Sequence, residues 1–310
     1  MNAVITILTG GLGNQMFYYA CHTVLRHRYA FDILSFYFIK RANEHQGYEL
    51  GRVFDIPDRK NLFFDGLSRF VRKYTVCRND SRNYIKYPVR WLIFILDHIG
   101  FHIISRINTE GWLCFDSKLL QPRLGLTFYI HDGYWSETFF REYESEIREK
   151  FRFNPDKLNP ESANAKIKIE KCNSVSLHVR RGDYLHFPEY FGEICTLDYY
   201  EKAIDYICSK VDSPVFYVFS DDVEWVKNNL RLPGEAVFVD WNTGEDSWQD
   251  MCLMSYCKHN IVANSTFSWW GAWLNRNEGK TVIAPFRFCN GAEIPDFIPA
   301  SWMTVGEFDF

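Results

Sequence analysis

The amino-acid sequence predicts an α/β fold built on parallel sheets, in two domains. Its 310 residues are 47% hydrophobic, which supplies a large core in a chain longer than the commonest single domain. Apolar runs of strand length, rich in β-branched and aromatic residues, recur most regularly in the second half. Segments with helical spacing separate these runs, and this alternation is typical of a doubly wound parallel sheet.

The first expected element is a buried strand. The alternating β-branched residues of "MNAVITILTGG" predict it over Val4 to Leu8, before a glycine-rich turn. After a polar stretch that holds Pro155 and Pro160, further strands are predicted at 175–179, 215–219, 236–239, 260–263 and 281–284. Helices are predicted at 196–211, 222–230, near 247–257 and at 268–275.

Charge and cysteine content exclude several classes of protein. The formal net charge of -4 argues against a nucleic-acid partner, because domains that bind polyanions are usually strongly basic. Nine cysteines, an odd number without a C-x-x-C pair, indicate the reduced thiols of a cytoplasmic protein, not a disulfide framework or a zinc site. The N-terminus lacks the basic start and long apolar stretch of a signal peptide, so none is expected.

One region raises a membrane question. Between residues 68 and 90, seven basic residues stand against the single acid Asp80, and the apolar stretch 91–105 follows. That stretch is shorter than the ~20 residues of a spanning helix and is interrupted by polar residues. A solvated basic face followed by a core helix explains the pattern, and docking on an anionic membrane surface is the alternative.

Polar side chains directly follow three of the predicted strands. The clusters are Arg180, Arg181 and Asp183 in "HVRRGDY", Asp221 and Asp222 after "VFYVFS", and Asn264, Ser265 and Thr266 after "NIVA". Because ligands of parallel sheets bind at the carboxyl ends of the strands, the clusters are expected to converge on one edge. Helix capping is the alternative explanation for Asp221 and for Thr266.

The arginine pair has the weaker structural explanation. A cation near the start of a helix is disfavoured by the helix dipole, so Arg180 and Arg181 require an anion. A phosphate or pyrophosphate matches the forked donor geometry of two guanidinium groups. The sequence therefore predicts a phosphate-bearing ligand at this edge.

A glycine-rich turn, Gly10 to Met16, follows the first strand. Such a turn between a strand and a helix lets the backbone approach a ligand, and its amides can face an anion. It is not the dinucleotide fingerprint, which needs a glycine where Met16 stands, and it lacks the Gly-Lys-Ser/Thr of a P-loop. The turn alone leaves its ligand open.

Four motifs in order carry a resemblance to a known family. "GGLGNQMFYYA", "HVRRGDY", "FSDD" and "NSTFSWWGAWL" together resemble the α-1,2-fucosyltransferase family over nearly the whole chain. The resemblance implies GDP-β-L-fucose as donor, inversion at the anomeric centre, and no metal or other cofactor. It also implies a glycosyltransferase B-type fold of two Rossmann-like domains facing across a cleft. The membrane anchor of the family's Golgi members is not recognisable, so the bacterial type is expected.

The same resemblance assigns residues to the donor. Arg180 would neutralise charge on the β-phosphate as GDP departs, and Arg181 would either share that task or hold Asp183 by an ion pair. Asp221 or Asp222 would accept hydrogen bonds from guanine or ribose. The other assigned residues are His178 for the nucleoside (a core histidine being the alternative), Ser265, Thr266 and Ser268 for the phosphates, and Gly11, Gly13, Asn14 and Gln15 in the glycine-rich turn.

The acceptor hydroxyl must lose a proton as it attacks fucose. Asp183 is the first candidate base and Glu189 the second, and a third alternative uses no strong base because the transition state is oxocarbenium-like. Tryptophans can stack on sugar faces, which makes Trp135 a candidate, whereas Trp269 and Trp270 are expected in the core.

These inferences combine into one functional prediction. The N-terminal domain, 1–160, carries the glycine-rich loop on the acceptor side, and the C-terminal domain, 161–310, is a Rossmann-like unit that binds GDP-fucose. The enzyme is expected to fucosylate the 2-hydroxyl of a terminal β-galactoside, free or lipid-linked, in a surface polysaccharide. It is expected in the cytoplasm, with peripheral contact to the inner face of the membrane left open. The alternatives are a GDP-fucose transferase of another linkage and a non-catalytic glycan- or nucleotide-binding protein.

Overall fold

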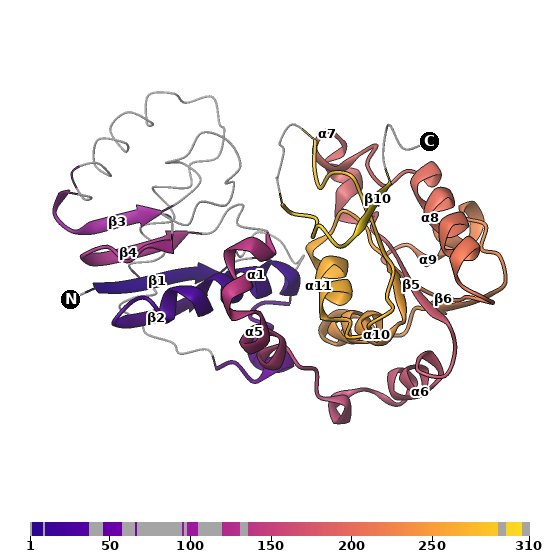
Figure 1. Ribbon diagram of the computed structural model, residues 1–310, viewed down its shortest axis with the longest axis horizontal. Helices are drawn as coiled ribbons and strands as arrows, with labels where there is room; N and C mark the ends of the chain where they lie inside the picture. Colours follow the sequence, from indigo (N-terminus) through magenta and orange to yellow (C-terminus); the bar gives the residue numbers. More distant parts are fainter. Residues whose placement is uncertain are drawn as a thin grey trace. The chain divides into compact units, whose positions relative to one another are not determined.

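The computed structural model divides the chain into two compact units, 1–150 and 151–310 (Figure 1). The residues that the structure describes are 2–8, 10–36, 46–57, 66, 95, 98–104, 120–130, 136–290 and 296–305. The division falls after Lys150, whereas the sequence places the domain boundary after residue 160. The segment 151–160 belongs to the second unit, because it leads into the first helix of that unit.

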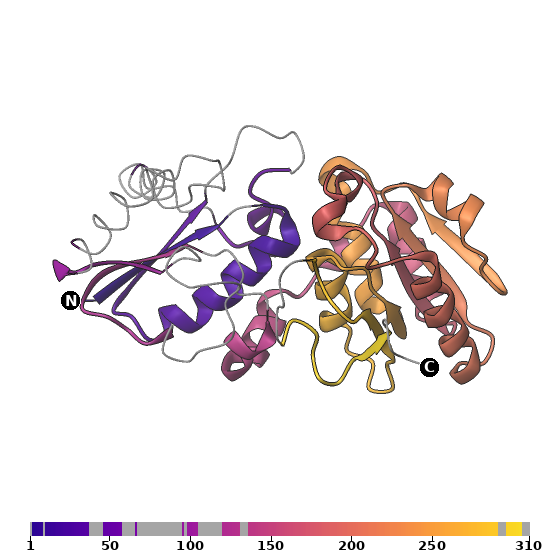
Figure 2. The same cartoon turned by 90° about the horizontal axis from the view of Figure 1, so that it is seen from above.

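The first unit is built on a parallel sheet of order β2-β1-β4-β3. Its elements are β1 (Asn2–Leu8), α1 (Leu12–Arg26), β2 (Phe31–Phe36), α2 (Leu50–Phe54), β3 (Phe101–Ile104), β4 (Gly125–Ile130), η4 (Glu137–Phe139), η5 (Arg141–Tyr143) and α5 (Glu144–Lys150). Helix α1 is buried almost throughout, between the sheet and the segment 137–150 (Figure 2). Phe17 packs on Phe140, and Arg26 pairs with Glu146, so both contacts hold that segment on α1.

The second unit is built on a six-stranded parallel sheet of order β10-β9-β8-β5-β6-β7. Its strands are β5 (Ser174–Val179), β6 (Val215–Ser220), β7 (Glu235–Val239), β8 (His259–Ile261), β9 (Val282–Pro285) and β10 (Met303–Val305). Its α-helices are α6 (Pro160–Ile169), α7 (Pro188–Phe191), α8 (Leu197–Lys210), α9 (Val223–Asn229), α10 (Trp248–Tyr256) and α11 (Thr266–Leu274). Short 3-10 turns are η6 (Pro155–Lys157), η7 (Asp183–His186) and η8 (Gly244–Asp246).

Helices cover both faces of this sheet, as a doubly wound fold requires. Helices α8 and α9 pack on one face, where Tyr200 and Ile204 meet the buried residues of β5 and β6. Helices α6 and α10 pack on the other, where Ile169 and Leu253 meet Tyr217. The prediction of an α/β fold with parallel sheets is therefore confirmed.

The predicted strands and helices of the second half are all present, with ends that differ by at most two residues. Helices α6 and α7 and strand β10 were not predicted. Trp269 and Trp270 lie in the core as expected, 1% and 0% exposed, with ring centroids 5.0 Å apart. Trp135 lies outside the described residues.

The sequence raised two further questions, about membrane-spanning helices and about disulfide bonds. In the described ranges, no helix combines the length and apolar character that crossing a bilayer requires. The seven cysteines that the structure describes all carry free thiols. Most of the basic and apolar region 68–105 lies outside the described residues.

Candidate active site

The strand order of the second unit defines where a ligand can bind. From β5 the sheet grows one way through β6 and β7, and the other way through β8, β9 and β10. The winding therefore reverses between β5 and β8, and ligands of open parallel sheets bind at the carboxyl ends of the strands beside such a switch point. The segments that follow β5, β6 and β8 are the three predicted polar clusters. Tyr184 joins the first to the third, since its hydroxyl donates to the main-chain oxygen of Asn264 at 2.9 Å.

Arg180 and Asp221 join the first cluster to the second. One guanidinium nitrogen of Arg180 lies 3.0 Å from Oδ2 of Asp221, while Oδ1 accepts the main-chain N–H of Arg181 at 2.9 Å. Gly182 leaves room for this carboxylate, because a Cβ at position 182 would lie 2.6 Å from Oδ2 of Asp221 and would force it to shift. The side chain of Arg180 remains 31% exposed, so it is oriented by Asp221 and still accessible to a ligand.

Arg181 is held by the second aspartate. Its Nε lies 3.2 Å from Oδ2 of Asp222, and its guanidinium carbon lies 3.8 Å from the ring centroid of Trp225. Asp222 also caps α9 by accepting the N–H of Trp225 at 3.1 Å. The capping aspartate is thus Asp222 and not Asp221, and the ion-pair partner shown for Arg181 is Asp222. The side chain of Asp183 is not among those described, and its residue lies in η7.

The third cluster opens α11, and its members differ in role. Ser265 is the N-cap and accepts the N–H of Phe267 at 3.3 Å, so the cap is Ser265 and not Thr266. Thr266 is the first helical residue and is half-buried. Ser268 is 1% exposed, and its hydroxyl accepts the N–H of Ala263 at 3.2 Å. That burial does not fit the expected contact of Ser268 with phosphate, and its hydroxyl instead fixes the loop that leads into α11.

His178 is buried at the carboxyl end of β5, 6% exposed. Its Nδ1 is enclosed and has no hydrogen-bond partner among the residues that the structure describes. Burial, together with the nearby charge of Arg180, lowers the pKa of His178 to about 3, so the ring stays neutral at physiological pH. An orphaned buried nitrogen of this kind requires an explanation, and a ligand or an ordered water can supply the missing partner.

The two candidate bases lie beyond the arginine motif. Glu189 is exposed on the one-turn helix α7, on the segment that follows η7. Around it, Leu185, Phe187 and Tyr190 are also exposed, so this loop presents apolar surface next to the candidate site.

The glycine-rich turn belongs to the first unit. Gly10 has φ of +76°, a left-handed conformation that favours glycine, and Gly11 is the N-cap of α1. Gly13 is buried in the first turn of the helix, and Asn14 is half-buried beside Gly10. The turn therefore has the geometry that the sequence suggests for a close backbone approach.

Gln15 has a different role from the one expected. It is fully buried, its side-chain nitrogen donates to the main-chain oxygens of Gly10 and Gly47 at 2.8 and 2.7 Å, and its oxygen accepts the N–H of Glu49 at 3.0 Å. These bonds occupy its amide, so it does not fit a direct contact with the donor. Gln15 fastens the turn to the segment 47–49.

Sequence reasoning missed Glu49. Its carboxylate is buried and accepts a hydrogen bond from the backbone of Leu12, at the start of α1, with Arg52 3.3 Å away. Burial raises the pKa of Glu49, and the charge of Arg52 acts in the opposite direction. An anion of the protein itself therefore occupies the start of α1, and no pattern in the sequence signals this distant partner.

Among the described residues, no three His, Cys, Asp or Glu side chains lie grouped as metal ligands. Metal-free chemistry remains an expectation from the resemblance, to be tested by experiment.

Comparison with known proteins shows which family the chain belongs to. The model of Glycosyl transferase family 11 matches residues 115–293. The O-antigen biosynthesis glycosyltransferase WbnK of Escherichia coli is 32% identical, over 96% of this chain and 99% of WbnK. An α-1,2-colitosyltransferase of Escherichia coli is 31% identical, over 98% of this chain and 99% of that protein. The galactoside α-(1,2)-fucosyltransferase 1 of Lagothrix lagotricha is 32% identical over 45% of this chain and 40% of its own length.

Among solved structures, a mutant of Arabidopsis thaliana FUT1 in complex with GDP is similar with a TM-score of 0.51. It is 13% identical, over 91% of this chain and 70% of that one, and the likeness concerns the fold. This agrees with a glycosyltransferase B-type α/β architecture of two parallel sheets. Because the family model covers more than half of the chain and two relatives match it almost from end to end, the protein is a glycosyltransferase that belongs to glycosyl transferase family 11.

Proposed function

We propose that this glycosyltransferase moves L-fucose from GDP-β-L-fucose to the 2-hydroxyl of a terminal β-galactoside, with inversion, and so forms an α-1,2-fucosyl glycan. The observation that carries the proposal is the oriented arginine pair, Arg180 and Arg181, beside the switch point of the second unit. The family and the names of the relatives support the reaction class, and the O-antigen role of WbnK supports a surface polysaccharide as product.

Departure of GDP is the step that these arginines serve. As the bond between the anomeric carbon and the β-phosphate oxygen breaks, negative charge develops on the phosphate, and fixed cations stabilise it without reorganisation. A guanidinium has five N–H donors, so Arg180 can keep its bond to Asp221 and still donate to a phosphate oxygen. Arg181 is held by Asp222 and Trp225, which places a second cation beside the first. Neither needs a metal ion to complete the task.

The remaining donor contacts follow from the same edge. The N-terminus of α11, with Ser265 and Thr266, offers backbone N–H groups to the phosphates. His178 is the nucleoside contact, because its orphaned Nδ1 is neutral and buried. Asp221 and Asp222 each retain acceptor capacity for guanine or ribose beyond the bonds they make to the arginines.

The acceptor hydroxyl attacks fucose and must lose its proton in doing so. Attack from the face opposite GDP inverts the centre, and the proton of the hydroxyl passes to Asp183, to Glu189, or to water late in an oxocarbenium-like transition state. The first unit is the proposed acceptor-side domain, with Gly11, Gly13 and Asn14 as the backbone approach and Gln15 as its fastening.

The test is a transfer assay with GDP-fucose and lactose in the presence of EDTA, followed by NMR of the product linkage. An α-1,2 product formed without metal is the expected result. Arg180→Ala should abolish turnover, whereas Arg231→Ala, an exposed arginine between α9 and β7, should not. GDP bound without any transfer to lactose or N-acetyllactosamine would refute the proposal, and a product of another linkage would correct its acceptor.

One alternative donor is favoured by a specific observation. The α-1,2-colitosyltransferase matches nearly the whole chain, and colitose is fucose without its 3-hydroxyl. The same assay run with GDP-colitose decides between the donors, because the physiological one should give the higher kcat/KM.

Location is part of the same proposal. We place the enzyme in the cytoplasm, where reduced thiols and sugar nucleotides coexist. The basic and apolar region 68–105 would bind the inner face of the membrane. Co-sedimentation with vesicles that contain anionic lipid should exceed that with neutral vesicles. Equal sedimentation with both would remove the membrane contact.

A further inference from the structure

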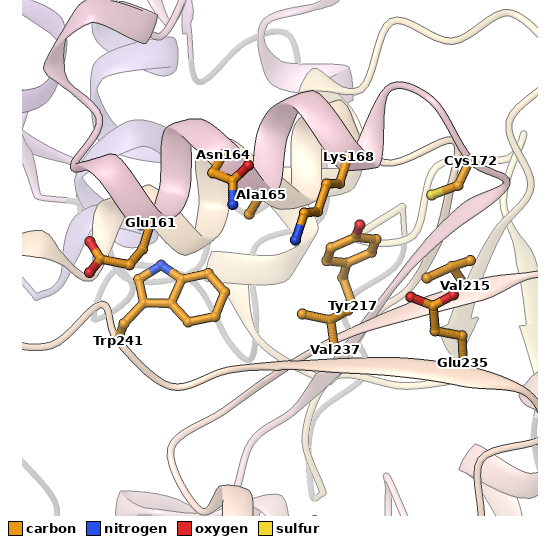
Figure 3. A pocket seen from close by; sticks show the side chains of 10 residues that line it. All are labelled: Glu161, Asn164, Ala165, Lys168, Cys172, Val215, Tyr217, Glu235, Val237 and Trp241. Carbon is orange, nitrogen blue, oxygen red and sulfur yellow. The ribbon is translucent and has the colours of Figure 1, made fainter.

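A groove lies on the second unit, away from the arginines of the candidate active site. It has a volume of about 370 Å³, within the range of ~300–1,000 Å³ usual for small-ligand sites. Helix α6 forms one wall, and β6, β7 and the residue Trp241 form the other (Figure 3). The groove runs from Glu235, the first residue of β7, to Trp241, beyond its last. It shares no lining residue with the carboxyl edge of β5 and β6.

Four polar side chains line this groove without using their hydrogen-bonding capacity inside the protein. They are Glu161, Asn164, Lys168 and Glu235. In the part of the chain that the structure describes, none of them makes a side-chain hydrogen bond or an ion pair. In Figure 3, Lys168 extends from α6 towards Tyr217, while Glu161 lies beside Trp241 at the other end. Donors and acceptors are thus both available to a ligand.

A network of hydrogen bonds fixes Trp241, the tryptophan that lines the groove. Trp241 is half-buried, and its indole N–H donates to the hydroxyl of Ser162 at 3.0 Å. Ser162 in turn donates to Asn242 at 3.0 Å, and Asn242 donates to Asp250 at 2.8 Å. A ring fixed by a buried network can offer its face to a ligand without an ordering cost.

The charged, polar and aromatic side chains that line the groove indicate which class of ligand it would bind. Two carboxylates against one ammonium disfavour a phosphate-bearing or otherwise anionic molecule. A purely apolar ligand would desolvate four unpaired polar groups, which is costly. A sugar ring fits both limits, because its C–H face packs on an aromatic ring while its hydroxyls both donate and accept.

We infer that this groove is an accessory subsite that binds sugar rings of the acceptor glycan at a distance from the reacting galactose. The inference rests on the proposed function for the identity of the glycan. Such a subsite would favour acceptors long enough to occupy it together with the active site over short ones.

The experiment follows the indole N–H of Trp241 in the NMR spectrum of the full chain labelled with ¹⁵N-tryptophan. Trp241→Phe identifies its signal among the ten tryptophans. The titrant is lacto-N-neotetraose, a tetrasaccharide that ends in β-galactose, with saturating GDP present throughout. The Trp241 signal should shift in a saturable manner. Lys168→Ala should weaken this binding about tenfold, as loss of a charge-assisted hydrogen bond does, and leave GDP binding unchanged.

Lys171→Ala is the matched control, because Lys171 is an exposed lysine just beyond the end of α6 and does not line the groove. It should bind the tetrasaccharide like the wild type. A Trp241 signal that does not move, or equal binding by the two lysine variants, would overturn the inference. Transfer of fucose to lactose is measured separately and decides the proposed function by itself, so the two can fail independently.

Discussion

Gly182 offers a test of the donor site that alters no charged group. In Gly182→Ala the new Cβ would stand 2.6 Å from Oδ2 of Asp221 and 3.1 Å from its Cγ. Ordinary contact begins near 3.4 Å, so the carboxylate has to move by roughly 0.8 Å. The 3.0 Å bond from Asp221 to Arg180 and the 2.9 Å bond to the N–H of Arg181 would both be strained or broken. Arg180 would then lose the partner that orients it.

The expected effect is a weaker affinity for GDP. A hydrogen bond to a charged group contributes about 1.5–3 kcal/mol, so the dissociation constant of GDP should rise by about 10- to 100-fold. Isothermal titration calorimetry measures this directly. Gly279→Ala is the matched control, because a Cβ at Gly279 meets nothing within 4 Å, and it should bind GDP like the wild type. If folded Gly182→Ala also bound GDP like the wild type, the assignment of Arg180 as an oriented phosphate ligand would be refuted.

Two further predictions concern stability. Burial raises the pKa of Asp250 from 3.8 to about 7, so the folded state holds a proton that the unfolded state has lost, and stability should fall as pH rises across that interval, by up to about 4 kcal/mol. Asp250→Asn should remove this fall in urea unfolding, and an unchanged pH dependence from pH 4 to 8 would contradict it. Gln15→Leu should cost the first unit about 3 kcal/mol, since it leaves one buried and two part-buried main-chain groups without their partner, and a loss of activity at wild-type stability would restore a direct role in donor contact.

Local signals in the sequence were sufficient for much of the fold, and distant contacts account for what was missed. Strand β6 is a nearly continuous apolar run, and β5 alternates Val175, Leu177 and Val179 with small or polar residues; both are buried on both faces, and such segments can be recognised without a partner. Helix α6 had a recognisable start, since Asn159 caps it and Pro160 occupies its first turn, but its polar composition concealed it. Strand β10 has only three residues, too few for a periodic pattern.

In the candidate site, too, some features could be predicted from the sequence and others could not. The convergence of the arginines and aspartates follows from the rule that parallel strands share a carboxyl edge, and it was predicted. The pairing of Arg180 with Asp221 and of Arg181 with Asp222 depends on side-chain directions, which neighbouring positions in a sequence do not distinguish. The burial of Gln15 depends on Gly47 and Glu49, more than thirty residues along the chain. No local pattern could have revealed it.

The two ion pairs also determine how the empty enzyme responds to the small anions of the cell. Because each arginine already faces an aspartate, the two pairs carry two positive and two negative charges, which cancel before the donor arrives. Orthophosphate or sulfate would have to compete with two covalently attached carboxylates for the guanidinium groups. Each of these anions is small and would form only a few contacts. A sugar nucleotide gains the base, the ribose and two phosphates together. The site is therefore suited to exclude such small anions, and the rate at which GDP-fucose associates should depend only weakly on ionic strength.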